Sequence, residues 1–402
     1  MLEDLKAELI KHVRHLCVEI GPRPIGSPGD HAAADYIQGV FRAAGLDVEA
    51  QRFECPAWQD DGTSLVLDGE QLDAAANAFS PPCDVSAPAV AIGTLAELEA
   101  AELTGRIGIL YGDLTKTPLS PKSWFLKSER EGHIIRLLEE KNPAALITVQ
   151  SRPGDLERVI VDWEFPIPSA TVPARVGLRL LQQGAPTMQL RIRSRQAPGH
   201  TCNLVARKAG QGPARIVLCA HYDTTIDTPG AVDNAAGAAA LLALAQVLGH
   251  QELAHGLEWI AFSGHEYLPL GDDEYLRRCG DQLEEIIVAI NFDAVGQHLG
   301  ANSIAIFASS SAFQERVAEL VTRYPGVAWV DPWPESNHST FAWRGVPSLA
   351  FSSVGRIRLD HLRADSVEWV SPAKLGEVVS LVLALVESLQ DKSLDWTRET
   401  GS

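Results

Sequence analysis

The apolar positions at the start of the chain follow a helical period. Leu5, Leu9, Val13 and Leu16 recur every three to four residues, which predicts an amphipathic helix over residues 2–20 that ends at Gly21. A second helix is predicted over 27–45, because serine and proline stand at its start and glycine at its end. Apolar and polar residues then alternate over 46–50, as in a strand.

Residues 59–195 have a different pattern of apolar and polar positions. Short apolar runs at 107–111 and 144–149 are separated by turns that contain proline and glycine, and helices are predicted near 134–140 and 176–181. We therefore expect a smaller β-rich α+β domain inserted at 59–195. The Ala-Pro-Gly-His run at 197–200 is interpreted as a linker.

From residue 200 onward, apolar strands alternate with helices. Strands are predicted at 216–220, 257–262, 286–290, 304–307 and 348–351, and helices at 235–248 and 375–389. Strands of this kind form a mixed, mostly parallel sheet that helices cover on both faces. We expect a discontinuous α/β main domain made of 1–58 and 196–402, with a loose polar tail at 391–402.

The composition narrows the classes of function. The 402 residues carry a formal net charge of −18, which argues against a nucleic-acid binder because such proteins present a basic face. The acidic N-terminus is unlike a signal peptide, and the apolar runs fall short of the ~18 residues of a membrane span. We expect a cytoplasmic protein without membrane or nucleic-acid partners, whose six scattered cysteines are reduced thiols.

Carboxylate and imidazole side chains follow the predicted strands at their C-terminal ends. Ligands bind at these ends in open α/β sheets, so the residues there are candidates for one shared site. The candidates are His221, Asp223, Asp233, His265, Glu266, Asp293 and His361. Any one of them alone is more often a helix cap or a loop residue, and the argument therefore rests on the ordered set.

Imidazole and carboxylate are the ligands of catalytic zinc, which keeps one coordination position open for water. Five such residues can hold two metals if one carboxylate bridges them. Three carboxylates and two neutral histidines then supply −3 against +4, and a bridging hydroxide brings the sum to zero. Two metals about 3.5–4 Å apart make hydroxide available at neutral pH and polarise a carbonyl.

Seven segments in the main domain add order and spacing to this set. They lie at 203–206, 221–223, 230–237, 262–266, 291–296, 336–341 and 361–366. In these segments the chain resembles zinc metallopeptidase family twenty-eight, the co-catalytic zinc aminopeptidases that include aminopeptidase Y and the bacterial leucyl aminopeptidases. Residues 105–107 and 167–169 are similar to the protease-associated domain that is often inserted in this family.

The resemblance implies an aminopeptidase that releases N-terminal residues from short peptides or amino-acid amides with two divalent ions, zinc being the expected metal. It implies one ion at His221, Asp233 and Asp293 and the other at Asp233, Glu266 and His361. Whether the chain forms a homodimer stays open.

Two further residues receive roles from the resemblance. Asp223 would hydrogen-bond His221 and fix the tautomer of its ring. His338 lies in a segment that approaches the site in the family, and a substrate-binding role stands beside a plain loop or capping role.

The chain departs from the family pattern at His265, where the family usually has a glutamate that takes a proton from water and delivers it to the leaving amine. An imidazole can act as a base near neutral pH, but the imidazolium it forms would stand beside two dications. Three interpretations follow: His265 still carries the proton, it is an extra metal ligand or orients another substrate, or the enzyme is slow or inactive. We favour retained hydrolysis with His265 as the altered base.

Two rival functions come from other classes. One is a repurposed, non-catalytic binding module, and the other is acyl transfer by a glutaminyl-cyclase-like site with a single zinc. His265 and Glu266 also imitate the start of the helical zinc motif HExxH, but Pro269 stands where the second histidine belongs. A serine-hydrolase elbow and a phosphate-binding loop are both missing from the sequence.

Overall fold

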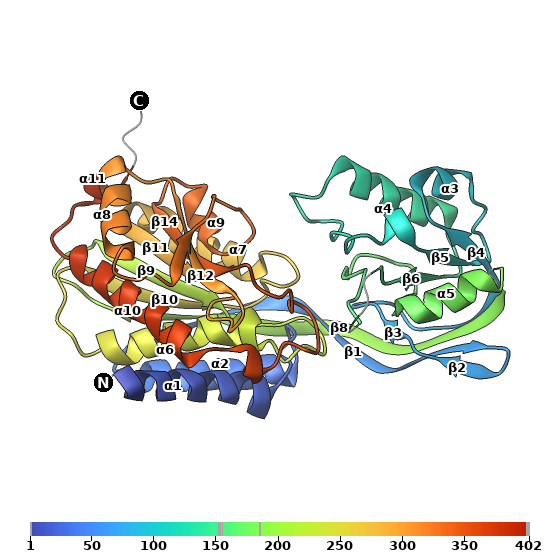
Figure 1. Cartoon of the computed structure of the whole chain (residues 1–402), viewed down its shortest axis with the longest axis horizontal. Helices are drawn as coiled ribbons and strands as arrows, with labels where there is room; N and C mark the ends of the chain where they lie inside the picture. Colours follow the sequence, from blue (N-terminus) through green and yellow to red (C-terminus); the bar gives the residue numbers. More distant parts are fainter. Residues whose placement is uncertain (1, 152–153, 155, 185, 399–402) are drawn as a thin grey trace. The chain divides into compact units, whose positions relative to one another are not determined.

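The structure is a computed structural model that describes residues 2–151, 154, 156–184 and 186–398. Its contacts divide the chain into two compact units (Figure 1). Unit 1 comprises Met1–Cys55 and His200–Ser402, and unit 2 comprises Pro56–Gly199. The sequence placed these boundaries at 58/59 and 195/196, and the likeness of unit 2 to a protease-associated domain stays a prediction.

Unit 1 is built on a mixed, mostly parallel sheet, which confirms the predicted α/β fold class. Its strands follow the order β13, β12, β14, β11, β9, β10 and β8. Strands β14, β11, β9 and β10 run parallel, whereas β12 and β8 run antiparallel to β14 and β10. The bounds are β8 Thr187–Lys208, β9 Arg215–His221, β10 Gly256–Phe262, β11 Ile286–Phe292, β12 Ala301–Phe307, β13 Val327–Trp329 and β14 Ser348–Val354.

Helices cover both faces of this sheet because successive side chains of a strand point to opposite faces. Leu218 and Ala220 of β9 belong to the larger apolar cluster, and Val217 and Cys219 belong to the smaller one. The larger cluster includes side chains from α1 Leu2–Arg14, α2 Pro28–Ala43, α6 Ala236–Leu248, α8 Ser311–Val321 and α10 Pro372–Ser388. The smaller cluster includes side chains from α7 Leu270–Cys279 and α9 His338–Ala342.

The register of the central strands brings their C-terminal ends together. His221 at the end of β9 stands opposite Phe262 at the end of β10. Asn291, near the end of β11, stands opposite Cys219. The loops that follow these three strands therefore leave the sheet at one edge, where open α/β sheets bind their ligands.

The helix after β9 is the most apolar of unit 1. The stretch Ala231–Leu248 is long and apolar enough to cross a membrane by length and composition, and 89% of it is buried inside the fold. Its alanines leave room for close approach, and it packs against α1, α2 and α10. Burial of this kind is typical of a core helix in a folded domain.

Unit 2 has its own sheet and its own apolar clusters. Strands β4 Cys83–Ile92, β5 Ile107–Leu110, β6 Ala145–Val149 and β7 Ser169–Val172 lie parallel in this order, and β3 Ala75–Ala76 pairs antiparallel with β7. The first half of β8 pairs with β4, and β1 Asp47–Leu67 forms a hairpin with β2 Glu70–Leu72. The helices are α3 Leu95–Ala100, α4 Glu129–Lys141 and α5 Ala174–Gln182.

Two expectations about irregular segments are wrong. The predicted linker at 197–200 lies inside β8, because β8 pairs with β1 and stays extended through its proline and glycine. The tail expected to be loose from 391 forms the short helix α11, Leu394–Thr397. The buried hydroxyl of Thr397 donates to the carbonyl of Ile287 at 2.9 Å and so ties this tail to β11; residues 399–402 lie outside the described residues.

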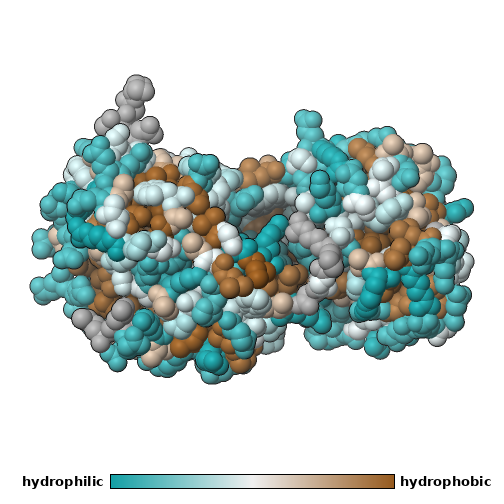
Figure 2. Space-filling view, viewed as in Figure 1, coloured by the Kyte–Doolittle hydropathy of each residue, from teal (hydrophilic) through white to brown (hydrophobic). Residues whose placement is uncertain are grey.

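The face of the molecule in Figure 2 is mostly hydrophilic, with scattered apolar patches. Large apolar side chains that are exposed in unit 1 include Leu299 and Trp343, at 62% and 54%. Single exposed apolar residues are normal for a folded protein.

Candidate active site

His221 and Asp223 leave the end of β9 and lie buried in unit 1. Nδ1 of His221 lies 3.2 Å from the main-chain oxygen of Asp223, and 3.6 Å from its carboxylate. A hydrogen bond from Nδ1 to this carbonyl leaves the lone pair on Nε2, which faces the other candidates. The Asp223 carboxylate instead accepts the main-chain N–H groups of His265 at 3.2 Å and Glu266 at 3.1 Å.

Two carboxylates meet Nε2 of His221. Oδ1 of Asp233 lies 3.3 Å from this nitrogen, and Oδ1 of Asp293 lies 3.7 Å from it. Asp233 precedes Asn234, whose side chain donates to the Phe292 carbonyl at 2.9 Å. This bond ties the Asp233 loop to the end of β11, next to Asp293.

The other face of Asp233 meets the two remaining candidates. Nε2 of His361 lies 3.0 Å from Oε2 of Glu266 and 3.8 Å from Oδ2 of Asp233. Glu266 is 5% exposed, whereas the side chain of His361 is 43% exposed. Asp233 therefore stands between the two groups, and its role as a bridging ligand stays a prediction.

His265 joins the first group. Its ring stacks on that of His221, with centroids 4.1 Å apart and an angle of 29° between the rings. Its Nε2 lies 3.9 Å from Oδ2 of Asp293. One ring nitrogen or carboxylate oxygen from each of His221, His265 and Asp293 lies within 4.8 Å of the other two, and the same holds for His221, Asp233 and Glu266.

His338 stands at the start of α9 and is fully buried. Its Nε2 contacts the main-chain oxygen of Trp333 at 2.7 Å, and its ring packs on Phe307 and Trp333. Burial lowers the pKa of His338 to about 4, so the ring is neutral at pH 7. Its Nδ1 is buried without a hydrogen-bond partner, and a substrate-binding role stays a prediction.

The charges of the cluster are poorly balanced without a cation. Burial alone would lower the pKa of His221, but contacts with Asp223, Asp233 and Asp293 raise it well above its usual value. The pKa of Glu266 is raised by burial and by the charge of Asp233. Protons and metal ions compete for the same lone pairs, so a site that holds protons this tightly is suited to a divalent cation.

The donor set also fits a metal by geometry. Atoms bound to one zinc at about 2.0–2.2 Å lie roughly 3.3–3.5 Å apart in a tetrahedral arrangement. The separations of 3.3 Å and 3.7 Å around Nε2 of His221 are of this size. The same Nε2 is buried without a hydrogen-bond partner, which is expensive unless something else binds its lone pair.

Arg23, which no motif of the sequence marked, is fully buried beneath the site. Its guanidinium donates to five main-chain carbonyls at 2.7–3.0 Å; they belong to Leu16, Gly21, Tyr222, Pro229 and Gly230. The main-chain N–H of Arg23 donates to the Thr224 hydroxyl at 2.8 Å, and the main-chain N–H of Thr224 donates to the Arg23 carbonyl at 3.2 Å. A single side chain thus holds the loop between His221 and Asp233 to the N-terminal segment.

Asp365 also fixes the main chain of this loop, at the end that carries Asp233. Its carboxylate accepts the main-chain N–H groups of Val232 at 2.9 Å and Asp233 at 3.0 Å. Burial raises the pKa of Asp365 to about 7, against the lowering effect of these two hydrogen bonds. The sequence marked Asp365 as part of a motif, but its spacing from Asp233 gave no sign of this contact.

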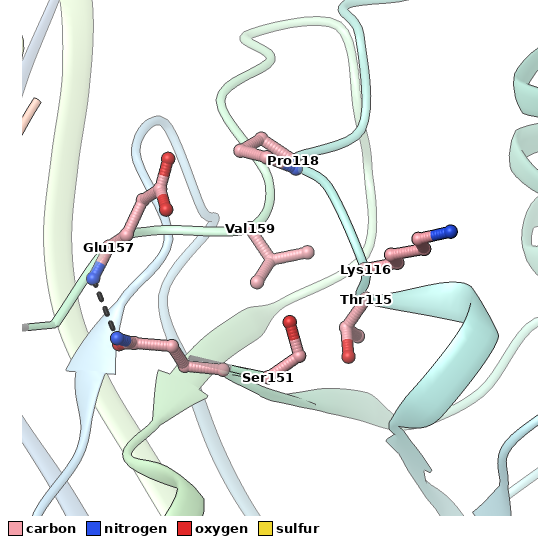
Figure 3. A pocket seen from close by; sticks show the side chains of 7 residues that line it. Thr115, Lys116, Pro118, Ser151, Glu157 and Val159 are labelled. Atoms are coloured by element: carbon pink, nitrogen blue, oxygen red, sulfur yellow. Dashed lines mark hydrogen bonds between the residues drawn. The ribbon is translucent and has the colours of Figure 1, made fainter. Parts of the chain in front are cut away.

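A separate small pocket lies in unit 2, between the loops after β5 and β6 (Figure 3). Thr115, Lys116 and Glu157 are among the residues that line it. The main-chain N–H of Glu157 donates to the side-chain oxygen of Gln150 at 3.0 Å. The pocket shares no residue with the cluster described above.

The segment that carries the cluster matches a known family. Residues 203–386 match the model described as Peptidase family M28, and they include all seven motif segments. This part of unit 1, which is somewhat less than half of the chain, is therefore similar to peptidase family M28. This match supports the resemblance drawn from the motifs, and the roles of the candidate ligands stay predictions.

Individual relatives are more distant. The chain is 25% identical over 286 residues to "Probable lipoprotein aminopeptidase LpqL" of Mycobacterium tuberculosis, covering 68% of this chain and 55% of that protein. It is 24% identical over 394 residues to "Aminopeptidase YwaD" of Bacillus subtilis, covering 93% of this chain and 82% of that protein. The chain thus matches little more than half of the mycobacterial relative.

The fold is shared with a solved structure. BSAP, a zinc aminopeptidase from Bacillus subtilis, superposes with a TM-score of 0.80 at 21% identity, covering 98% of each chain. At this identity the likeness establishes the fold, and the chemistry must be argued from the residues of this chain.

Proposed function

We propose that this chain is a metal-dependent hydrolase of the aminopeptidase type, which removes N-terminal residues from short peptides with two divalent ions, zinc being the expected metal. The observation that carries the proposal is the position of Asp233. Its two carboxylate oxygens face different groups, with Oδ1 3.3 Å from His221 and Oδ2 3.8 Å from His361. The names of the aminopeptidase relatives support the same class of substrate.

The chain's own residues define what each part of the site does. His221, Asp233 and Asp293 would hold one ion, and Asp233, Glu266 and His361 the other. Bound zinc would polarise the scissile carbonyl and lower the pKa of water. Asp223, Asp365 and Arg23 fix the loops that carry these side chains through the main-chain contacts given above, so the donors are positioned before a ligand arrives.

Peptide hydrolysis also needs a proton carrier. Water adds to the carbonyl carbon, the carbon–nitrogen bond breaks, and one proton passes from the water to the leaving amine. His265 is the residue that the sequence predicts for this transfer. Its side chain is 20% exposed and borders Asp293 and His221, so solvent can reach the site.

The proposal is tested by hydrolysis of amino-acid anilides and dipeptides with zinc, with a chelator, and in the Asp233→Asn variant. We expect release of the N-terminal residue that depends on metal and falls on the order of a thousand-fold in the variant. Activity that persists unchanged with chelator or in Asp233→Asn would contradict the proposal. A native protein that is inert while His265→Glu is active would show that hydrolysis is not retained.

A further inference from the structure

We propose that His265 is a ligand of the metal held by His221, Asp233 and Asp293, rather than the proton carrier of the reaction. The inference rests on the proposed function, because it assigns a residue to the same metal site. It follows from the position of the His265 ring and from the hydrogen bond that fixes its main chain. It also follows from the difference between the group of side chains around His221 and the group around His361.

The ring of His265 is where a ligand of that metal would be. Its Nε2 lies 3.9 Å from Oδ2 of Asp293, close to the 3.7 Å between Nε2 of His221 and Oδ1 of the same side chain. One donor atom from each of His221, His265 and Asp293 lies within 4.8 Å of the other two. A small movement of these side chains would bring the donors to the roughly 3.3–3.5 Å that separates two ligands of one tetrahedral zinc.

The main chain of His265 is fixed by the same carboxylate that fixes the main chain of Glu266, a candidate ligand of the second metal. One oxygen of the buried Asp223 carboxylate accepts the N–H of His265, and the other accepts the N–H of Glu266. A single carboxylate therefore fixes both neighbours at once. Glu266 points to the second group and His265 to the first, so each group receives one side chain from this pair.

This assignment changes the coordination of the first metal. With His265, two imidazoles and two carboxylates would hold this metal, which is the number of protein ligands in a closed zinc site. The second metal keeps three ligands from Asp233, Glu266 and His361, and its side is the exposed one. The first metal then becomes mainly a structural ion, and the second retains the open position that a substrate or water needs.

The assignment also has a chemical consequence. An Nε2 bound to metal has no lone pair left to accept a proton, so the proton of the attacking water passes to solvent before the amine receives one. A positioned general base contributes typically 10²–10⁴-fold. We therefore expect slow, metal-dependent hydrolysis by the native chain and a faster reaction after His265→Glu, which supplies a carboxylate.

Metal affinity tests the inference independently of activity. Competition with a chromophoric zinc chelator measures both dissociation constants of the native chain, of His265→Ala, and of His31→Ala as the matched control. His31 also stacks on a histidine of unit 1, His200, with ring centroids 4.8 Å apart, but it does not belong to the cluster. We expect the tighter zinc to weaken by at least roughly 100-fold in His265→Ala and to stay unchanged in the control.

A second readout uses Co²⁺ in place of zinc, since its visible absorption bands report ligand number and geometry. We expect these bands to change in His265→Ala and to remain native in His31→Ala. If the native chain binds two ions and hydrolyses peptides, but His265→Ala keeps both affinities and the same Co²⁺ bands, then this inference is wrong and the proposed function stands. If the native chain binds no metal, both are wrong.

Discussion

The two halves of the cluster around Asp233 differ in burial and in the number of their candidate ligands. The His221 half is enclosed, with a side chain that is 1% exposed, a stacked second imidazole and two nearby carboxylates. The half of His361 is open, with an imidazole that is 43% exposed. The comparison teaches that one sheet edge can hold an enclosed and an open group of candidate ligands, with Asp233 between them.

The largest expected effect comes from removing what the halves share. Asp233→Asn removes the negative charge that both proposed metal sites share and replaces one of the two carboxylate oxygens by an amide nitrogen. Both ions should therefore be lost together, and kcat/KM should fall on the order of a thousand-fold. Metal analysis after dialysis, measured beside anilide hydrolysis, checks this. Retention of one ion with full affinity would show that Asp233 does not serve both halves.

Removing one histidine from each half should lower the free energy of unfolding by different amounts. In chelator, His221→Ala leaves Asp233 and Asp293 without their buried partner and should lower the free energy of unfolding by about 3 kcal/mol. His361→Ala removes a half-exposed side chain, whose loss should cost less than about 1 kcal/mol. Urea unfolding of both variants tests the difference, and equal losses would contradict the contrast in burial.

Asp223 supports both halves through main-chain contacts rather than through metal. Asp223→Asn keeps the shape of the side chain but replaces one accepting oxygen by an amide that cannot accept the N–H of His265 or Glu266. We expect zinc affinity to fall 10–100-fold, as is typical when a residue behind a ligand is changed. The chelator competition described above measures it, and Asp68→Asn, at an exposed turn outside the cluster, is the control.

Asp30 lies behind the closed half, where its carboxylate accepts the Ser263 hydroxyl at 3.0 Å and the N–H of Gly26 at 3.1 Å. Burial raises the pKa of Asp30 to about 6. The folded protein therefore binds this proton more tightly than the unfolded chain, whose aspartates titrate near 3.9. The stability that the proton provides is complete below about pH 4 and is lost as the pH rises through 6.

The matching experiment compares native protein and Asp30→Asn by urea unfolding from pH 4 to pH 7. The native protein should lose on the order of 2–3 kcal/mol relative to the variant across this range. The variant does not titrate at this position, so the other groups cancel in the difference. A constant difference across the range would show that Asp30 is not protonated in the folded chain at pH 5.

Much of the fold followed from local pattern. The strand runs at 216–220 and 257–262 correspond to β9 and β10, and Ser27 caps α2 by accepting the N–H of Asp30 at 3.2 Å, as its place before Pro28 suggested. The candidate ligands could be found because each follows a strand, and parallel strands end at one edge of a sheet.

Long-range contacts explain what the sequence could not predict. Arg23 lies about two hundred residues from the carbonyls of Tyr222 and Gly230 that it binds, and an arginine after a glycine-proline break carries no local sign of such a partner. The linker prediction at 197–200 failed for the same reason, since pairing with β1 overrides the turn preference of proline and glycine. Stacking of His265 on His221 likewise depends on strand register.

The measurement that tests the central claim most directly is the number of zinc ions per chain after equilibrium dialysis, in the native protein and in His361→Ala. The account predicts two ions in the native chain. It predicts one in the variant, because the closed half keeps its own ligands while the open half is left with Asp233 and Glu266. A native chain without zinc, or a variant that loses both ions or keeps both, would contradict it.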